Sequence, residues 1–123
     1  INSGDSLTID SAGVMRIGGT SNMLLGAPDF NTYDLHLQSI VDFYGSDQTI
    51  SDIPANLTNG FGEVLLQNTG IKLVDQPLVI RGNLYITNDA TLQNDTGVNA
   101  LSVRKSIINS AQVNNRGIIE IGE

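Results

Sequence analysis

Few residues of this 123-residue chain are of a type that could do chemistry. His36 is the only histidine and cysteine is absent, so a nucleophile would have to be one of many serines or threonines without a recognisable catalytic context. His36 alternates with Leu35 and Leu37, which indicates the opposite, solvent-facing side of a strand. We therefore interpret His36 as a surface residue.

Carboxylates are the remaining candidates for catalysis. Asp42, Asp47 and Asp52 follow one another at regular intervals, and Asp89 lies near Asp95. Paired carboxylates in a groove would suit glycoside hydrolysis, and clustered oxygen ligands would suit calcium. Most of the aspartates, however, stand beside Ser, Asn, Gly or Thr, which is typical of turns, and no calcium-loop pattern is present. We expect structural acids, no metal site and no cofactor.

Two further binding patterns are weak. The glycines of RIGGTS, residues 16–21, lack both the order of a dinucleotide-binding loop and the lysine of a phosphate-binding loop. Tyr33, Phe43 and Tyr44 are close enough in sequence to contribute to an aromatic strip for sugars, although core packing is the favoured role. No catalytic residue is predicted, and we expect a protein that is not an enzyme.

Charge is low and unevenly distributed. The chain has 13 acidic and 6 basic residues, a net charge of −7, and charged residues make up only 15% of it. Residues 1–62 hold seven aspartates against Arg16 alone, a net of −6, whereas residues 63–123 hold six acids and five bases, a net of −1. Such a surface repels phosphate backbones, so neither nucleic acid nor membrane insertion is expected, and no apolar run approaches bilayer length.

The composition is typical of an extracellular or virion β protein. Asn, Ser, Thr, Gln and Gly replace the usual charged residues, and without cysteine the stability must come from packing, hydrogen-bond ladders or oligomerisation. Since the sequence begins with Ile1 and not Met, we interpret it as a processed product or an excerpt of a longer polypeptide.

A repeated phrase is the strongest signal in the sequence. It consists of an apolar residue, Gln or Asn, Asn, a short polar insert, Gly and another apolar residue, and it occurs at 66–71, 92–98 and 113–118. Asparagine and glycine tolerate the backbone conformations of tight corners. The predicted structural corners are Asn68, Gly70, Asn94, Gly97, Asn115 and Gly117.

Two other phrases repeat in step with the first. The pattern of residues 78–84 is echoed at 101–107. IDSAGV at 9–14 returns as INSAQV at 108–113, with ITNDAT at 86–91 as a looser relative. The length of the repeating unit therefore varies between the interval from Asn94 to Asn115 and the longer interval from Asn68 to Asn94. Both lengths are within the range of solenoid repeats.

Apolar residues two positions apart indicate short strands within each unit. Examples are Leu84 with Ile86 and Leu101 with Val103. Short strands with polar corners and this period predict a parallel β-solenoid over residues 63–123, with Leu66 and Ile71 pointing inward and corner asparagines stacked in a ladder. An antiparallel meander would fit the same alternation.

The chain divides into an irregular acidic β region, 1–62, and the repeat-containing region, 63–123. In the first, residues 6–19 predict a strand, a tight turn and a strand. Residues 33–44 fit either a strand or one face of a helix, and we favour the strand. Pro54, Asn59-Gly60 and Gly62 indicate a loop or boundary at 51–62.

Two stretches resemble known fibre proteins. SLTIDSAGVMRIGG resembles a stretch of bacteriophage tail-fibre and related virion-fibre proteins, although the segment after Gly19 lacks the usual proline; the matching residues are Leu7, Ile9, Asp10, Ser11, Gly13, Ile17 and Gly18. GNLYITNDATLQNDTG, residues 82–97, is similar to the strand-corner repeats of secreted bacterial β-solenoid adhesins. Both resemblances imply an elongated, non-enzymatic β structure outside the cell or on a virion, either solenoid-like or an intertwined trimeric β-fibre.

Three functions are compatible with these observations. The first is a structural and adhesive module of a phage fibre that gives reach and host attachment, located on the virion and bound to other virion subunits and to a host surface glycan or protein. Its apolar end at Ile118, Ile119 and Ile121 would invite aggregation unless another chain or a following segment covers it, and we expect a homo-oligomer, in the first place a trimer. The others are a bacterial cell-surface adhesin or filament subunit, secreted or surface-bound, and a polysaccharide-degrading tailspike fragment.

Overall fold

The computed structural model describes residues 6–18, 32–50, 60–75, 77–96 and 100–122. Across these ranges the chain forms fourteen short strands and no helix, so the all-β prediction is confirmed. No described segment is therefore a helix long and apolar enough to cross a membrane.

All strand pairs among the described residues are parallel, and these strands belong to four sheets. The first sheet consists of β2 (Val14–Ile17), β4 (Ile40–Phe43), β6 (Glu63–Leu66), β9 (Leu84–Ile86) and β12 (Ile107–Asn109). The second sheet consists of β5 (Gln48–Thr49), β7 (Gly70–Val74), β10 (Ala90–Asn94) and β13 (Gln112–Asn115). The third sheet consists of β8 (Leu78–Ile80), β11 (Ala100–Val103) and β14 (Ile118–Ile121). A small fourth sheet pairs β1 (Ser6–Ile9) with β3 (Thr32–Leu35).

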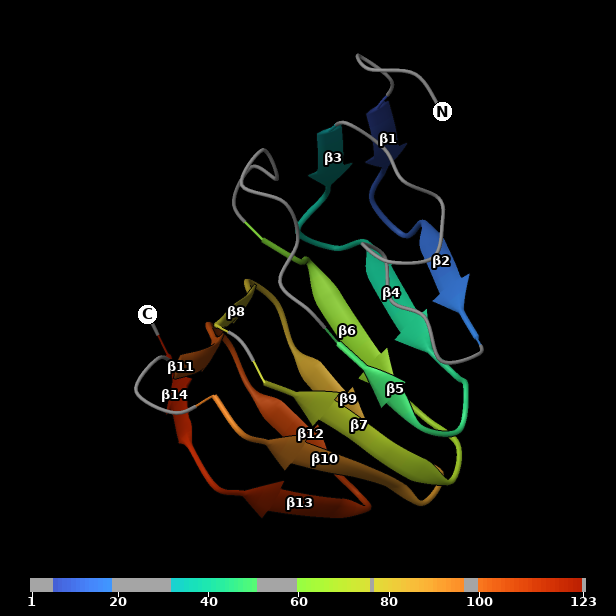
Figure 1. Ribbon diagram of the computed structural model, residues 1–123. Coiled ribbons are helices and arrows are strands. Elements are labelled where there is room, and N and C mark those ends of the chain that lie inside the picture. Colours follow the sequence, from blue (N-terminus) through green and yellow to red (C-terminus); the bar gives the residue numbers. More distant parts are fainter. Residues whose placement is uncertain (1–5, 19–31, 51–59, 76, 97–99, 123) are drawn as a thin grey trace.

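Consecutive strands never pair, because each turns a corner into the next sheet and meets its partner only one coil later. The complete coils are β6–β7–β8, β9–β10–β11 and β12–β13–β14, about three turns of a β-solenoid, and the colours of Figure 1 follow the stack from one coil to the next. Among the described residues, β2 and then β4 with β5 form two partial coils that stack before them. The predicted solenoid is thus confirmed. The antiparallel meander is excluded for the described strands, because it would pair neighbours in the sequence.

Register between coils stacks the inward side chains in columns. One column of the first sheet runs through Val41, Val64, Leu84 and Ile107, and one column of the third sheet through Leu78, Leu101 and Ile119. Leu84 and Leu101 are at most 1% exposed. Each fully buried side chain of this size stabilises the fold by about 1.5–3 kcal/mol. Because of the register, these side chains form a stack of apolar layers along the axis.

Strands from both sides of residue 62 share the first sheet, since β4 pairs with β6. The predicted strand, turn and strand within 6–19 are β1 and β2, with Ala12 at a φ of 64° in the turn between them. Residues 33–44 contribute β3 and β4, which confirms the strand interpretation over the helix. Most of the predicted loop at 51–62 lies outside the described residues.

The coil register agrees with one repeat and differs from another. Leu78 to Ile80 pair with Leu101 to Val103, as the echo of 78–84 at 101–107 predicts. Gly70, however, pairs with Ala90, so the segment at 66–71 stacks on ITNDAT at 86–91 and not on 92–98. The text of the two asparagine phrases is alike, but they belong to different corners of the coil.

Candidate functional site

The corner between the first and second sheets holds Asn68 and Gly70. Asn68 has a φ of 78° and Gly70 a φ of 132°, and a Cβ on Gly70 would collide with the carbonyl group of Ser46 on the coil before. Only glycine fits such a position. One coil later the same corner is turned by Asn88 and Asp89, which have φ values of 51° and 62°.

Beyond this corner, the side chains of β7 alternate between the core and the surface. Leu66 is buried as expected, at 1% exposure, but the prediction that Ile71 points inward is wrong, because Ile71 is 44% exposed. The residue that points inward is Lys72, which is fully buried. The alternation is the same on both sides of the corner, because Val64 and Leu66 before it and Lys72 and Val74 after it are all buried and lie an even number of positions apart. Ile71 therefore falls on the outward face.

Asn94 and Asn115 lie at a different corner, between the second and third sheets, and they stack directly on one another. Asn94 Nδ2 donates to Asn115 Oδ1 at 2.8 Å and to the carbonyl oxygen of Ile118 at 3.1 Å. Gly117 N donates to Asn115 Oδ1 at 3.1 Å, which tightens the turn into β14. Gly97 lies outside the described residues. The asparagine pair is a two-step ladder along the axis.

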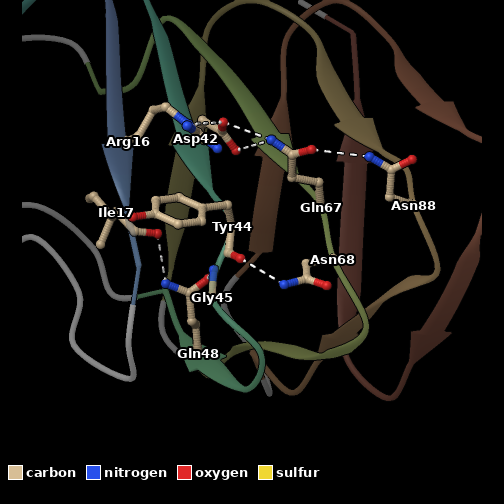
Figure 2. A network of polar contacts seen from close by, with 9 residues as sticks. All are labelled: Arg16, Ile17, Asp42, Tyr44, Gly45, Gln48, Gln67, Asn68 and Asn88. Carbon is tan, nitrogen blue, oxygen red and sulfur yellow. Dashed lines mark hydrogen bonds and ion pairs between the residues drawn. The ribbon is translucent and has the colours of Figure 1, made fainter.

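A longer polar ladder crosses four coils on the outward side of the first sheet. Arg16 Nε is 3.0 Å from Asp42 Oδ2, and Gln67 Nε2 donates to both Asp42 oxygens at 2.9 and 2.7 Å. Asn88 Nδ2 then donates to Gln67 Oε1 at 3.0 Å. Figure 2 shows these side chains in one continuous row. The Asp42 side chain is only 5% exposed, so its charge is balanced by the ladder rather than by water.

Lys72 is the buried charge of the core. It occupies a column of the second sheet between Gln48 and Leu92. Its Nζ donates to the carbonyl oxygens of Gly45 and, at 3.1 Å, Ser46, and to Gln48 Oε1 at 2.7 Å. Desolvation lowers the pKa of Lys72 below its ordinary value, although the negative charges of Asp42 and Asp47 oppose this shift.

Gln48 links Lys72, on the following coil, to Ile17, on the preceding coil. Its Nε2 donates to the carbonyl oxygen of Ile17 at 3.0 Å, and its Oε1 accepts from Gly45 N at 2.9 Å, as drawn in Figure 2. Lys72 and Gln48 therefore satisfy backbone groups of successive coils at one corner.

The described carboxylates that were considered for catalysis have structural roles. Asp47 Oδ1 accepts from Ile71 N at 2.8 Å, and Asp95 pairs with Arg116 at 3.1 Å. Asp42 belongs to the polar ladder, Asp89 turns a corner, and Asp52 lies outside the described residues.

The surface position predicted for His36 is confirmed, and its Nδ1 accepts from Gln38 N at 3.0 Å. Within the described parts of the chain, no group of three or more His, Cys, Asp or Glu residues is arranged to hold a metal ion.

Sequence reasoning missed the ladder and the buried lysine. Arg16, Asp42 and Gln67 follow one another at nearly equal intervals, close to the length of one coil, and this spacing of hydrogen-bonding side chains was the available signal. For Lys72 the signal was its place two positions before Val74, on the same side of the strand. A lysine is normally a surface residue, so alternation alone does not predict its burial.

Comparison of the chain with protein-family models, with curated proteins and with solved structures gives no match in any of the three.

Proposed function

We propose that the chain is a non-enzymatic structural module of an elongated fibre, in the first place a bacteriophage tail fibre, that gives reach and carries a surface for host attachment. The parallel coils, the columns of apolar side chains and the polar ladders along the axis support a role in building length. In such a stack, each coil packs against the coil before it and the coil after it, so further coils can be added at the end.

The main observation in support of this proposal is the incomplete burial of the last coil. Val103 is fully buried, but Ile121, which continues its column, is 59% exposed. Within the described residues, β12, β13 and β14 each pair along one edge only. The open edges and the partly covered apolar residues Ile107, Val113 and Ile119 form a surface of the kind that a further β-coil covers. We refer to these three residues and Ile121 as the end face.

The proposed occupant of the end face is another coil of the same fibre. A further coil, from a second subunit or from a following segment of a longer chain, would extend the columns and pair with the open strand edges. Of these two, we propose the second subunit and therefore a homo-oligomer. The trimer inferred from the fibre resemblance is part of this proposal. The alternative is a bacterial cell-surface adhesin or filament subunit, which the same coil geometry supports.

A charge on the end face tests the assembly. Ile119→Lys introduces an ammonium into a core column, whereas Ile108→Lys introduces the same charge on the outward side of the same coil, where Ile108 is 46% exposed. We expect oligomers of the unmodified chain in analytical ultracentrifugation, retained in the Ile108 variant and lost in the Ile119 variant. A chain that is monomeric at every concentration, or oligomers that survive Ile119→Lys, would contradict the proposal.

Antibodies against the folded chain separate the virion from the cell surface. Gold-labelled antibody on phage fibres in electron micrographs is the expected result. Labelling confined to bacterial surfaces would replace the phage fibre by the adhesin alternative and leave the structural role in place.

A further inference from the structure

A hollow lies beside the polar ladder, on the outward side of the first sheet. It has a volume of about 360 Å³, within the usual range for small-ligand sites. The five residues that line it come from four consecutive coils: Arg16, Tyr44, Gln67, Asn68 and Asn88. We call it the ladder groove.

The charge of the ladder groove is internally balanced. Arg16 supplies the one cation among its lining residues, and the guanidinium is paired with Asp42. Three of the other lining residues, Gln67, Asn68 and Asn88, are amides. Gln67 Nε2 donates to Asp42, Asn68 Nδ2 to the carbonyl oxygen of Tyr44, and Asn88 Nδ2 to Gln67 Oε1. A primary amide has two N–H donors and two acceptor lone pairs, so each side chain can make further hydrogen bonds of both kinds, and this wall matches a ligand whose groups both donate and accept. Hydroxyl groups have that property, whereas phosphates and carboxylates only accept.

Tyr44 adds an apolar plane to this polar wall. The Arg16 guanidinium lies 4.3 Å from the centre of the ring, and Tyr44 is 39% exposed. The ring crosses back over the preceding coil and lies close to Gly18, where an added Cβ would come within 2.8 Å of Cζ. Stacking on Arg16 and contact with Gly18 fix the ring orientation before any ligand arrives. Figure 2 shows Tyr44 beside the row of ladder side chains.

The groove extends along the solenoid axis. Neighbouring parallel strands are separated by roughly 4.8 Å, so side chains from four coils span roughly 14 Å. Hydrogen-bonding groups therefore recur at regular intervals beside an aromatic face. An extended peptide would be a poorer match, because it is bound through a free strand edge and the groove lies across strands whose backbone groups are already paired.

We infer that the ladder groove binds a neutral oligosaccharide. Its hydroxyl groups would exchange hydrogen bonds with the amides of Gln67, Asn68 and Asn88, and the apolar C–H face of one sugar ring would lie on Tyr44. The inference deepens the attachment part of the proposed function and rests on it for its biological setting. The ligand lies along the fibre axis, so neighbouring coils contribute to one site.

Titration with sugars tests the inference on the intact chain. The probes are short linear neutral oligosaccharides of glucose, galactose, mannose and N-acetylglucosamine, with oligogalacturonate and hyaluronan fragments as acidic counterparts. We expect at least one neutral probe at millimolar concentration to shift the side-chain amide signals of Gln67, Asn68 and Asn88 in ¹⁵N-edited NMR spectra. If no neutral probe shifts them, or if an acidic probe binds more tightly than every neutral one, the inference is wrong.

Three variants locate the site. Tyr44→Ala removes the ring and should weaken binding about tenfold. Gly18→Ala keeps the ring but displaces its outer end, so it should weaken binding in a chain whose core is unchanged. Tyr85→Ala removes a tyrosine on the outward side of the same sheet that does not line the groove, and binding should be unchanged. Binding that survives both Tyr44→Ala and Gly18→Ala would overturn the assignment.

The experiments test the sugar site and the fibre role separately. Oligomers in the ultracentrifuge without any response of the groove amides would contradict the sugar site and support the fibre role. Sugar binding by a chain that stays monomeric would contradict the fibre role and support the sugar site.

Discussion

The coil formed by β9, β10 and β11 and the last coil, formed by β12, β13 and β14, continue the same columns but differ in burial. Leu101 is fully buried and Ile119, directly above it in the column, is only partly covered. Asn94 is likewise fully buried, whereas its partner Asn115 is exposed. This difference shows that an inward residue is covered by the coil before it and by the coil after it. Its contribution to stability therefore depends on its neighbours above and below as much as on its own apolarity.

Truncation of the paired leucine and isoleucine is expected to give the largest difference. Leu101→Ala should lower the free energy of unfolding by about 2–5 kcal/mol, because it leaves a cavity between two coils. Ile119→Ala in the same column should cost about 1 kcal/mol, since one side of the residue is already open to water. Urea unfolding at a protein concentration that keeps the chain monomeric measures both. Equal losses would show that the last coil is covered in solution.

The two stacked asparagines should differ in the same direction by a smaller amount. Asn94→Ala removes a donor from a fully buried position, where it bonds both Asn115 and the carbonyl oxygen of Ile118, and should cost about 1–3 kcal/mol. Asn115→Ala should cost about 0.5 kcal/mol or less, because water can replace an exposed acceptor. Chemical denaturation of the two variants gives the comparison. A larger cost for Asn115 would indicate that its side chain is covered by a further coil.

The column of Lys72 ends at Val113 in the last coil, so it joins a buried cation to a partly covered apolar residue. The folded-state pKa of Lys72 is lowered, so the unfolded chain binds more protons between that pKa and 10.5. The free energy of unfolding should therefore rise with pH through this window, with the gain complete above 10.5 and lost as pH falls through the folded-state pKa.

Lys72→Met keeps a side chain of similar length and removes the titrating group. We expect the rise in stability at alkaline pH to be smaller in this variant than in the unmodified chain. Urea unfolding of the two proteins at a series of alkaline pH values measures the difference in slope. The same slope in both proteins would assign the rise to other groups.

The smallest effect is expected at the outer end of the polar ladder. Asn88 is exposed and makes one hydrogen bond to Gln67, so Asn88→Ala should change the free energy of unfolding by about 0.5 kcal/mol or less. Asp42→Ala, in the buried middle of the same ladder, should cost clearly more, because Arg16 and Gln67 would lose their shared acceptor. Equal costs in thermal or urea unfolding would mean that the ladder does not act as a connected network.

The fold could be predicted from the sequence because two signals agreed. Apolar residues two apart, as in Leu101 and Val103, define strands, and the echo of residues 78–84 at 101–107 fixes the coil length. Together they favour parallel stacking over an antiparallel meander, and the observed strand pairing decides between the two.

The register at the asparagine corners could not be predicted in the same way. Asn68 and Asn94 stand in nearly identical text, but Asn68 has a positive φ and is exposed at a corner, whereas Asn94 ends β10 and is fully buried. Backbone conformation of this kind leaves only a weak trace in residue identity, because asparagine also occupies ordinary strand ends such as position 94.

The candidate site was largely outside the reach of sequence reasoning. The spacing of Arg16, Asp42 and Gln67 approximates one coil length, but it marks a ladder only after the coil is known. The position of the Tyr44 ring over Gly18 depends on a side-chain rotamer and on the absence of a Cβ one coil earlier. Both are tertiary properties.

The parallel stacking of the coils also determines how the molecule would carry mechanical load. The hydrogen bonds between coils run along the axis, so tension applied to the two ends pulls directly on the ladder that joins the outermost coil to its neighbour. That coil would detach first and the next one after it, each with a similar number of strand hydrogen bonds. The force needed to unravel such a rod is then set by a single coil, and adding coils lengthens the rod without weakening it.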